Sequence, residues 1–263
     1  MKALLVRVGI DLTSEKKGGG HWLAPVNPGT NEFVYVPIPE TEEVIPEYRT
    51  GYEGFFEPSE RLGKRLENRF INRASHLDPD FSELTYGDID CIDATDGNNH
   101  RGKSLLKLGE DDRLVFFAGL DPGRRPDRNV PLVQAIIGLY VIKESPKRAT
   151  EIPNIEKYLG KNAHLRRDPK DKDIIVFAKP APLSGRLEKC IPIAELNNGH
   201  YYLKENLFKE WGGFLDKDDA PLKNVHLQRT PLLQFRDPEK FNKWFNSYKY
   251  YDGSRIKLVQ SNN

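Results

Sequence analysis

Cysteine is scarce in this chain of 263 residues, in which Cys91 and Cys190 are the only two. Neither belongs to a CxxC pair or to another zinc-binding spacing, so a zinc ribbon and a disulfide scaffold are both excluded. The first residues, Met1 to Val8, form a short apolar run that alternates like a strand and does not resemble a secretory signal. We therefore expect free thiols and a cytoplasmic protein.

Long hydrophobic runs are also missing. The longest apolar stretch, Pro131 to Ile142, is interrupted by Gln134. It is shorter than the roughly 20 apolar residues that a bilayer span requires. A mean hydropathy of −0.64 agrees with a chain surrounded by water. No association with a membrane is therefore expected.

An excess of one charge is absent as well, since 40 Lys and Arg residues face 39 Asp and Glu residues. Proteins that coat long stretches of DNA usually carry a strong positive excess. Any contact with nucleic acid is therefore expected to be local, at a patch or in a pocket.

Aromatic residues, by contrast, are plentiful. The chain has 13 Phe, 11 Tyr and 3 Trp residues, which supply enough apolar surface for a folded core. No internal repeat and no low-complexity linker divides the sequence. The length suits one large domain or two closely packed ones.

Apolar runs predict the strands, and four-residue spacing of apolar positions predicts the helices. We expect strands at 1–10, 33–39, 113–119, 132–142, 173–178 and 186–193. We expect helices at 57–75, 105–112, 203–211 and 238–248, with Asp237-Pro238 as the start signal of the last. Loops rather than long helices separate the middle strands. This favours an α+β fold with a mixed, mostly antiparallel sheet or partly closed barrel and peripheral helices.

Two nucleotide-binding motifs are missing: the chain has no GxGxxG and no Walker A sequence. Regular alternation of strands and helices is missing too. A Rossmann fold and an α/β barrel are therefore not expected.

Several segments occur in an order that resembles a known family. They are LLVRVGID (4–11), GGG (18–20), FVYVPIPE (33–40), HLDPDF (76–81), YGD (86–88) and RGK (101–103). Together they resemble the third family of nucleotide modification associated domains, whose members are proposed to make or handle hypermodified DNA bases. The resemblance implies a connection to nucleic-acid base chemistry. It assigns neither a reaction nor catalytic residues.

A second resemblance covers the middle third of the chain. The segments GEDDRLVFF (109–117) and IIGLYV (136–141) are similar to PUA-like domains, which include the EVE, ASCH and YTH modules. Many of these domains hold a flipped or modified base in a pocket on a small barrel. The chain lacks their tryptophan cage at matching positions, so a methylated base is not specifically predicted. The resemblance implies one compact domain, 1–263, made of an N-terminal extension, a PUA-like barrel core and a C-terminal helix, at 1–103, about 104–235 and 236–263.

The most chemically suggestive cluster is His76-Leu77-Asp78-Pro79-Asp80. On an extended chain, residues two apart point the same way, so His76, Asp78 and Asp80 would share one face. One imidazole and two carboxylates suit acid–base catalysis or, less expectedly, a divalent metal ion. The alternative is a turn, because Asp-Pro starts turns and Asp80 could cap the next segment. We expect no bound cofactor or metal.

Four residues are candidates for binding a base. Trp22 and His21 follow a glycine-rich loop and could stack on a base, although Trp22 could equally be buried. Tyr86 could stack as well, and Asp88 could accept hydrogen bonds from exocyclic amines. The alternative for Tyr86 and Asp88 is a solvated loop.

Five cationic residues are candidates for binding phosphate. Arginine can contact phosphate through two hydrogen bonds, and N–H groups near a glycine suit phosphate oxygens. A solvated loop is the more common role for such short basic segments. The candidates are Arg101, Lys103, Arg166, Arg167 and Arg186.

No nucleophile stands out. GxSxG is absent, Cys190 lies in an apolar alternation, and acidic neighbours of Cys91 disfavour a thiolate. The leading hypothesis is a protein that recognises a base in DNA, RNA or a free nucleotide during base modification, alongside base-modification enzymes. The alternative is an enzyme that modifies the base itself through His76, Asp78 and Asp80. A third hypothesis is a protein-interaction module with a flat apolar patch.

Overall fold

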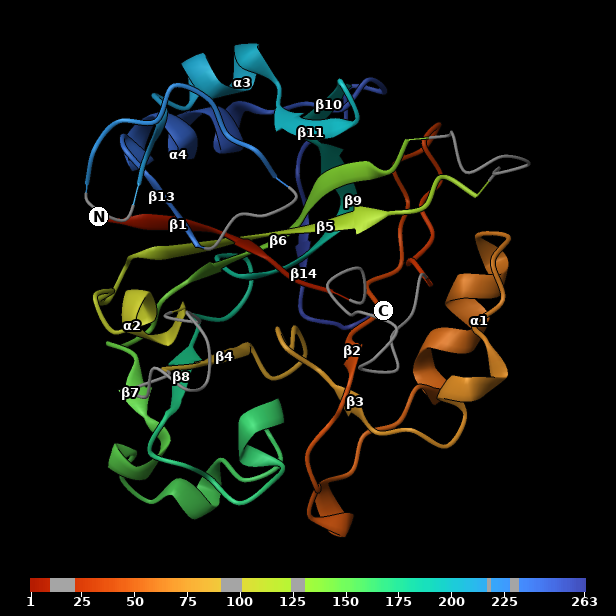
Figure 1. Ribbon diagram of the computed structural model, residues 1–263, viewed down its shortest axis with the longest axis vertical. Helices are drawn as coiled ribbons and strands as arrows, with labels where there is room; N and C mark the ends of the chain where they lie inside the picture. Colours follow the sequence, from red (N-terminus) through yellow and green to blue (C-terminus); the bar gives the residue numbers. More distant parts are fainter. Residues whose placement is uncertain (10–21, 91–100, 124–130, 217–218, 228–231) are drawn as a thin grey trace.

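A computed structural model gives the structure, and it describes residues 1–9, 22–90, 101–123, 131–216, 219–227 and 232–263. The described residues form a mixed α+β fold with much sheet and few helices (Figure 1). This confirms the fold class expected from the sequence. Among the described residues, no helix combines the length and the apolar character that a membrane crossing needs.

A seven-stranded sheet runs through the middle of the molecule in the order β12-β13-β1-β5-β6-β9-β14 (Figure 1). Its strands pair antiparallel except for β1 and β5, which are parallel. The sheet is therefore mixed and mostly antiparallel, as expected. The strands are β1 (Ala3–Arg7), β5 (Arg113–Leu120), β6 (Val133–Val141), β9 (Gly185–Pro192), β12 (Phe214–Leu215), β13 (Leu233–Phe235) and β14 (Leu258–Val259).

The expected barrel is not confirmed. The order of the described strands begins with β12 and ends with β14, and no pairing joins these two ends. Near the N-terminus, β1 lies inside the sheet between β13 and β5. The boundaries of an N-terminal extension and a PUA-like core stay predictions.

Three smaller sheets surround the large one. The sheet β4-β8-β7 lies below it in Figure 1 and consists of β4 (Thr85–Ile89), β8 (Asp173–Phe177) and β7 (Lys147–Arg148). The pair β2 (Ile38–Pro39) and β3 (Ser75–His76) is short, so the strand expected at 33–39 is wrong in its start, although it ends at Pro39. The hairpin of β10 (Ala194–Asn197) and β11 (His200–Leu203) lies at the top of Figure 1, at the opposite end of the molecule from the β4-β8-β7 sheet.

The helices lie around the sheets. They are α1 (Glu53–Arg61), α2 (Arg101–Leu105), α3 (Glu205–Glu210) and α4 (Pro238–Ser247). The expected start of α4 is confirmed, because Pro238 occupies its first turn and the Asp237 side chain accepts a hydrogen bond from Lys240 N. Short 3-10 helices complete the chain: η3 (Pro46–Tyr48), η4 (Asn68–Phe70), η6 (Ala149–Glu151), η7 (Ile155–Lys157) and η8 (Ala163–Leu165).

The helix expected at 57–75 is wrong in its bounds. Helix α1 starts earlier, contains Pro58 and ends at Arg61, and only the short η4 follows. Gly63, at φ +80°, stops the helix because this left-handed backbone does not continue an α-helix. The helix expected at 105–112 likewise lies earlier, as α2, and Leu105 is its last residue.

Aromatic side chains join the large sheet to the sheet that contains β4. The Tyr86 ring on β4 lies 5.2 Å from Phe116 on β5, and Phe116 lies 4.8 Å from Tyr140 on β6. Phe81, just before β4, contacts both Phe116 and Tyr140 edge-on. All four are buried, so the two sheets share one core. This shared core fixes β4, and with it the polar residues on both sides of β4.

Candidate functional site

Two histidines and an aspartate come together between β3, β4 and η8. Asp78 Oδ2 lies 3.9 Å from His76 Nε2 and 3.5 Å from His164 Nε2. The two imidazole rings are 5.0 Å apart, centroid to centroid, and nearly perpendicular. The side chain of His76 is 14% exposed, whereas those of Asp78 and His164 are 6% and 3% exposed. We call His76, Asp78 and His164 the His–Asp–His cluster.

Each histidine of the cluster is held by a second carboxylate. His76 Nδ1 lies 2.7 Å from Glu40 Oε2, and the pairing of β2 with β3 brings these residues together. His164 Nδ1 lies 2.8 Å from Asp173 Oδ1 at the start of β8. Because an ionised carboxylate can only accept hydrogen bonds, the contact with Glu40 assigns the Nδ1 proton of His76. His164 Nδ1 lies between two groups, Asp173 Oδ1 at 2.8 Å and Arg167 Nη2 at 2.9 Å. Each Nε2 therefore faces Asp78.

Asp78 is fixed from the other side. Its Oδ1 atom accepts a hydrogen bond of 2.8 Å from Gly87 N on β4. Gly87 has no side chain, and a Cβ there would lie 2.4 Å from His164 Cδ2. The glycine therefore lets the His164 ring lie against the β4 backbone. Because Gly87 N holds Oδ1 of Asp78, the other carboxylate oxygen, Oδ2, is the atom that faces both imidazoles.

Local hydrogen bonds set the position of η8, which carries His164. The Asn162 side chain caps η8 by accepting a hydrogen bond from His164 N at 2.9 Å. The Asn162 amide also donates to Thr85 Oγ1 on β4 at 3.2 Å. Arg167, 4% exposed, donates to Asp173 Oδ1 at 3.0 Å and pairs with Glu42 at the same distance. The surroundings of His164 are thus tied to both β4 and the segment after β2.

Burial and charge shift the pKa values in this region in opposite directions. Burial raises the pKa of Asp78, although the hydrogen bond and the charge of His164 oppose the shift. Burial also acts against protonation of His164, but hydrogen bonds to Asp173 and Asp78 outweigh it and raise the pKa of His164 to about 9. The cluster therefore pairs a proton donor with a carboxylate whose ionisation is disfavoured.

The two supporting carboxylates keep their charge. Burial alone would raise the pKa of Glu40, but the hydrogen bond and charge of His76 lower it to about 2. In the same way, burial is outweighed at Asp173 by its hydrogen bond to His164, and the pKa of Asp173 falls to about 2. Groups with such shifts are frequent at sites of catalysis.

The structure separates Asp80 from the residues with which the sequence grouped it. Asp80 Oδ2 lies 2.7 Å from Arg166 Nη2, in an ion pair whose side chains are 1% and 7% exposed. Asp80 Oδ1 accepts hydrogen bonds from Ser82 N, Glu83 N and the Asn262 amide. Asp80 is therefore placed as the cap of a turn. His164 is the third residue beside His76 and Asp78.

The residues expected to bind a base lie mostly in the core. Trp22 is 4% exposed and packs edge-on against Phe70, with Lys64 over its ring. Tyr86 is 2% exposed, and its hydroxyl donates to Asp88 Oδ2 at 2.9 Å. In this structure neither ring presents a face to solvent. His21 lies outside the described residues.

Of the residues expected to bind phosphate, Lys103 is exposed on α2, and the other four have partners within the chain. Arg101 pairs with Asp88 at 3.0 Å and also donates to Tyr86 Oη and to the carbonyl oxygen of Arg7. Arg166 and Arg167 form the ion pairs already described. Arg186, 8% exposed, donates to the carbonyl oxygens of Leu187 and Ser261.

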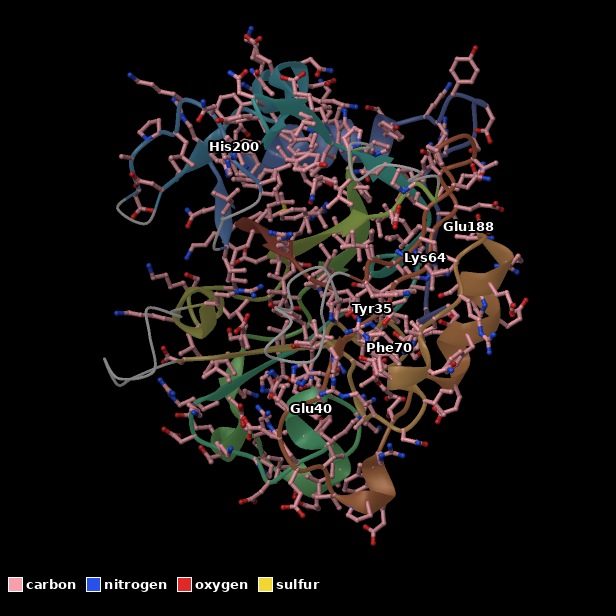
Figure 2. All side chains as sticks on the ribbon, turned by 45° about the vertical axis from the view of Figure 1, so that its right-hand side comes forward. Tyr35, Glu40, Lys64, Phe70, Glu188 and His200 are labelled. Atoms are coloured by element: carbon pink, nitrogen blue, oxygen red, sulfur yellow. The ribbon has the colours of Figure 1, made fainter. Side chains whose placement is uncertain are left out.

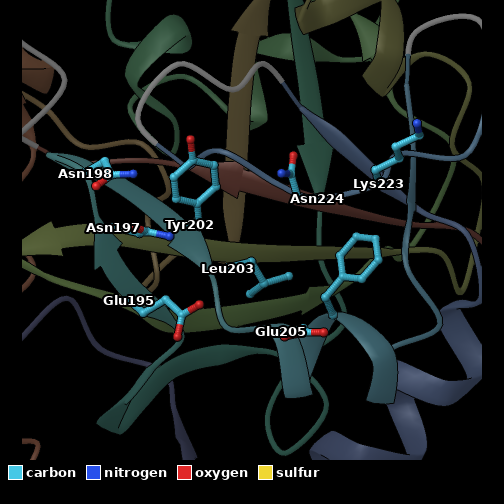
Figure 3. Close-up of a pocket in the computed structure, with 9 residues that line it drawn as sticks. Glu195, Asn197, Asn198, Tyr202, Leu203, Glu205, Lys223 and Asn224 are labelled. Atoms are coloured by element: carbon cyan, nitrogen blue, oxygen red, sulfur yellow. The ribbon is translucent and has the colours of Figure 1, made fainter.

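A pocket of about 380 Å³ lies elsewhere on the molecule, between the β10–β11 hairpin and α3 (Figure 3). Its lining is polar and includes Glu195, Asn197, Tyr202, Glu205 and Lys223. Figure 2 shows His200, at the start of β11, near one end of the molecule and Glu40 near the other. The pocket and the His–Asp–His cluster are therefore separate features.

The cluster is also the group within the described residues whose ligand atoms are spaced to hold a metal ion. One ligand atom from each of His76, Asp78 and His164 lies within 4.8 Å of the others. Sequence reasoning identified His76 and Asp78 but placed His164 in a basic loop, and it gave no role to Glu40 or Asp173. One sequence signal could have indicated this pair: His164 lies nine residues before Asp173, and Asp173 begins a predicted strand.

Comparison with known proteins agrees with the first resemblance seen in the sequence. Residues 2–223 match the family described as nucleotide modification associated domain 3. No curated protein matches the chain. No solved structure matches it either.

Proposed function

Because the chain belongs to the nucleotide modification associated domain 3 family, we propose that it catalyses a step in the modification of a nucleotide or nucleobase at the His–Asp–His cluster. The family match supports a role in nucleotide or base modification. It does not distinguish an enzyme that makes the modification from a protein that recognises the base.

The observation that carries the proposal of catalysis is the convergence of His76, Asp78 and His164 on one point. Each imidazole is oriented by its own carboxylate, which resembles the way enzymes orient a general acid or base. A base-recognition protein needs complementary surfaces and stacking faces, not a set of titratable groups held in this way. The cluster therefore favours an enzyme over a protein that only recognises a base.

The substrate is proposed to be DNA, RNA or a free nucleotide. The near balance of 40 basic and 39 acidic residues favours a small contact area over a long nucleic-acid groove. Recognition of a base without turnover, in a PUA-like pocket, is the leading hypothesis from the sequence, and here it becomes the alternative. It loses support because Trp22 and Tyr86, which were to supply stacking, are buried.

Production of the protein in bacterial cells, followed by mass spectrometry of nucleosides from DNA, RNA and the nucleotide pool, tests the proposal. The cell supplies co-substrates that a purified assay would lack. We expect a nucleoside of altered mass with the wild-type chain and not with His164→Gln. His200→Gln is the matched control, because His200 is exposed on β11, away from the cluster.

Two results would overturn the proposal of catalysis. One is the same set of nucleosides in cells that contain the wild-type chain and cells that contain His164→Gln. The other is a new nucleoside whose amount does not depend on His164. Selective binding of purified protein to one oligonucleotide, with no change in mass, would instead support a base-recognition protein.

A further inference from the structure

The orientation of the two imidazole rings in the His–Asp–His cluster points to a ligand between them. Both rings direct Nδ1 to a carboxylate, Glu40 for His76 and Asp173 for His164. Both therefore present Nε2 to Asp78 Oδ2, at 3.9 Å and 3.5 Å. These two distances are longer than the 2.7 Å and 2.8 Å contacts on the Nδ1 side. The contacts of the Nδ1 atoms with their carboxylates are thus short, and those of the Nε2 atoms with Asp78, at the centre of the cluster, are longer.

The spacing at the centre fits a metal ion. Two ligand atoms at about 2.1 Å from a tetrahedral or octahedral ion are about 3.0–3.4 Å apart. The closer pair in the cluster, at 3.5 Å, nearly has this separation, and all three ligand atoms lie within 4.8 Å. The other separations, up to 4.8 Å, must shorten by side-chain rotation when an ion binds.

The carboxylates behind the imidazoles match a further property of metal centres. A histidine that binds a metal usually donates its other ring N–H to a carboxylate or carbonyl, which fixes the tautomer and the ring orientation. In both histidines of the cluster, Nδ1 lies within hydrogen-bond distance of a carboxylate. Arg167 holds this outer layer together, because it donates to Asp173 and pairs with Glu42 while its Nη1 lies 3.8 Å from Glu40.

We propose that His76 Nε2, the Asp78 carboxylate and His164 Nε2 bind a divalent transition-metal ion and leave its remaining coordination positions open. This inference deepens the proposed function, and its catalytic meaning rests on that function. The geometric argument for binding is independent of the function.

The donor atoms narrow the choice of metal. Mg²⁺ and Ca²⁺ prefer oxygen ligands, whereas two imidazole nitrogens suit zinc, iron, cobalt or nickel. Two histidines and one carboxylate also leave room for water or substrate, as in catalytic rather than structural sites. This site differs from the less expected metal site that the sequence offered at His76, Asp78 and Asp80, because Asp80 is engaged by Arg166 and the turn.

The competing interpretation is a buried ion-pair network without a metal. In that network a protonated His164 lies between Asp78 and Asp173 and stabilises the fold by charge alone. The two interpretations differ in one measurable property, since only a metal site binds Co²⁺ or Zn²⁺ through His76 and His164 together.

Titration of untagged, chelator-treated protein with Co²⁺ tests the proposal, because Co²⁺ bound to nitrogen and oxygen ligands absorbs visible light. We expect one equivalent of Co²⁺ to bind with a new visible spectrum, and Zn²⁺ to displace it. His76→Gln and His164→Gln should each weaken Co²⁺ binding by more than about 100-fold, and Asp173→Asn should weaken it by about 10–100-fold. His200→Gln should leave the spectrum unchanged.

The test uses both His76→Gln and His164→Gln, so that it still gives a result if one of them does not fold. His164 is nearly fully buried, whereas His76 is partly exposed, so His76→Gln is the better tolerated change. Far-UV circular dichroism checks each fold. The proposal is overturned if the folded wild type binds Co²⁺ and Zn²⁺ no more tightly than folded His76→Gln.

The metal and the catalytic role can fail separately. A modified nucleoside in cells that depends on His164, without metal binding by the pure protein, would remove the metal and keep the enzyme. Metal binding that depends on His76 and His164, without any nucleoside of altered mass, would keep the metal site and remove the proposed function.

Discussion

Asp78 and Asp80 are two residues apart and have different surroundings. Asp78 faces two imidazoles, whereas Asp80 faces the guanidinium of Arg166 and the amides of a turn. Strand alternation would put both carboxylates on one face, but the chain turns after Asp80, which pairs with Thr85 as an isolated bridge. One carboxylate thus faces the imidazoles, and the other anchors the turn that precedes β4.

Asp80→Ala should be among the most destabilising polar substitutions in the chain. It would leave Arg166, 6% exposed, without its carboxylate partner, and the loss of one member of a buried ion pair costs about 3–5 kcal/mol. Urea unfolding of the wild type and the variant measures this loss.

Glu144→Ala is the matched control for that measurement. Glu144 pairs with Lys147 at the surface, with side chains 42% and 36% exposed, and such a pair contributes about 0–1 kcal/mol. Equal losses from the two variants would contradict the structural role given to Asp80.

At the scale of elements, β4 owes its position to glycines that allow other segments to lie close to it. Gly87 lets η8 approach β4 from one side. Gly102 on α2 does the same, because a Cβ there would lie 2.6 Å from Asp90 N, just after β4. Two helical segments and β8 thus meet at one strand, and this meeting brings His164 to Asp78.

Gly87→Ala should damage the cluster and the fold together. The added Cβ would lie 2.4 Å from His164 Cδ2 and 3.1 Å from Asn162 Oδ1, so the histidine ring must move. Overpacking of this kind costs about 1–3 kcal/mol. We expect a lower free energy of unfolding and weaker Co²⁺ binding, measured by urea unfolding and by the visible spectrum.

Gly109→Ala serves as the control, because among the described residues no atom beyond its chain neighbours lies within 4 Å of a Cβ at that position. It should bind Co²⁺ like the wild type. Normal Co²⁺ binding and stability in Gly87→Ala would show that the close approach of His164 to β4 is not required.

At the scale of the whole molecule, the aromatic core joins the two larger sheets, and some of its hydroxyls are buried. Tyr140 Oη donates to the Asp80 carbonyl oxygen at 2.7 Å, and Tyr52 Oη donates to the Pro37 carbonyl oxygen at 3.0 Å. Burial raises the pKa of both phenols above the ordinary value, and the charges of Asp80 and Asp78 add to the effect at Tyr140. The folded chain therefore keeps these protons when the unfolded chain has lost them.

Stability should fall as pH rises above about 10, where tyrosines of the unfolded chain ionise. The folded state then binds more protons than the unfolded state, so the free energy of unfolding decreases with pH. Phenolate absorbance and far-UV circular dichroism, followed together, measure this. Some of the 11 tyrosines should ionise before the fold is lost and the rest only with it.

Tyr52→Phe and Tyr140→Phe, combined, remove two of the buried phenols and should make the loss of stability with pH less steep. Exposed Tyr251→Phe is the control and should leave the slope unchanged. Complete formation of phenolate before any loss of circular dichroism would contradict the burial of these hydroxyls.

The sequence alone determined the strands that are long and continuously apolar. The predicted strands at 113–119, 132–142, 173–178 and 186–193 correspond to β5, β6, β8 and β9, and the helix start at Asp237-Pro238 is confirmed. These features depend on residues close together in the chain, so local patterns suffice to predict them. The prediction of a helix at 57–75 was wrong because the left-handed backbone at Gly63 ends the helix, although the spacing of the leucines continues beyond it.

Only the tertiary structure decided the composition of the candidate site and the openness of the sheet. His76 and Asp78 were visible as a local motif, but Glu40, His164 and Asp173 reach them through the pairing of β2 with β3 and of β4 with β8. Such contacts depend on which strands become neighbours and in what register, and a short motif carries no record of either. For the same reason, the motif could not show that Asp80 forms an ion pair with Arg166 and caps the turn, or that Asp78 faces the two histidines.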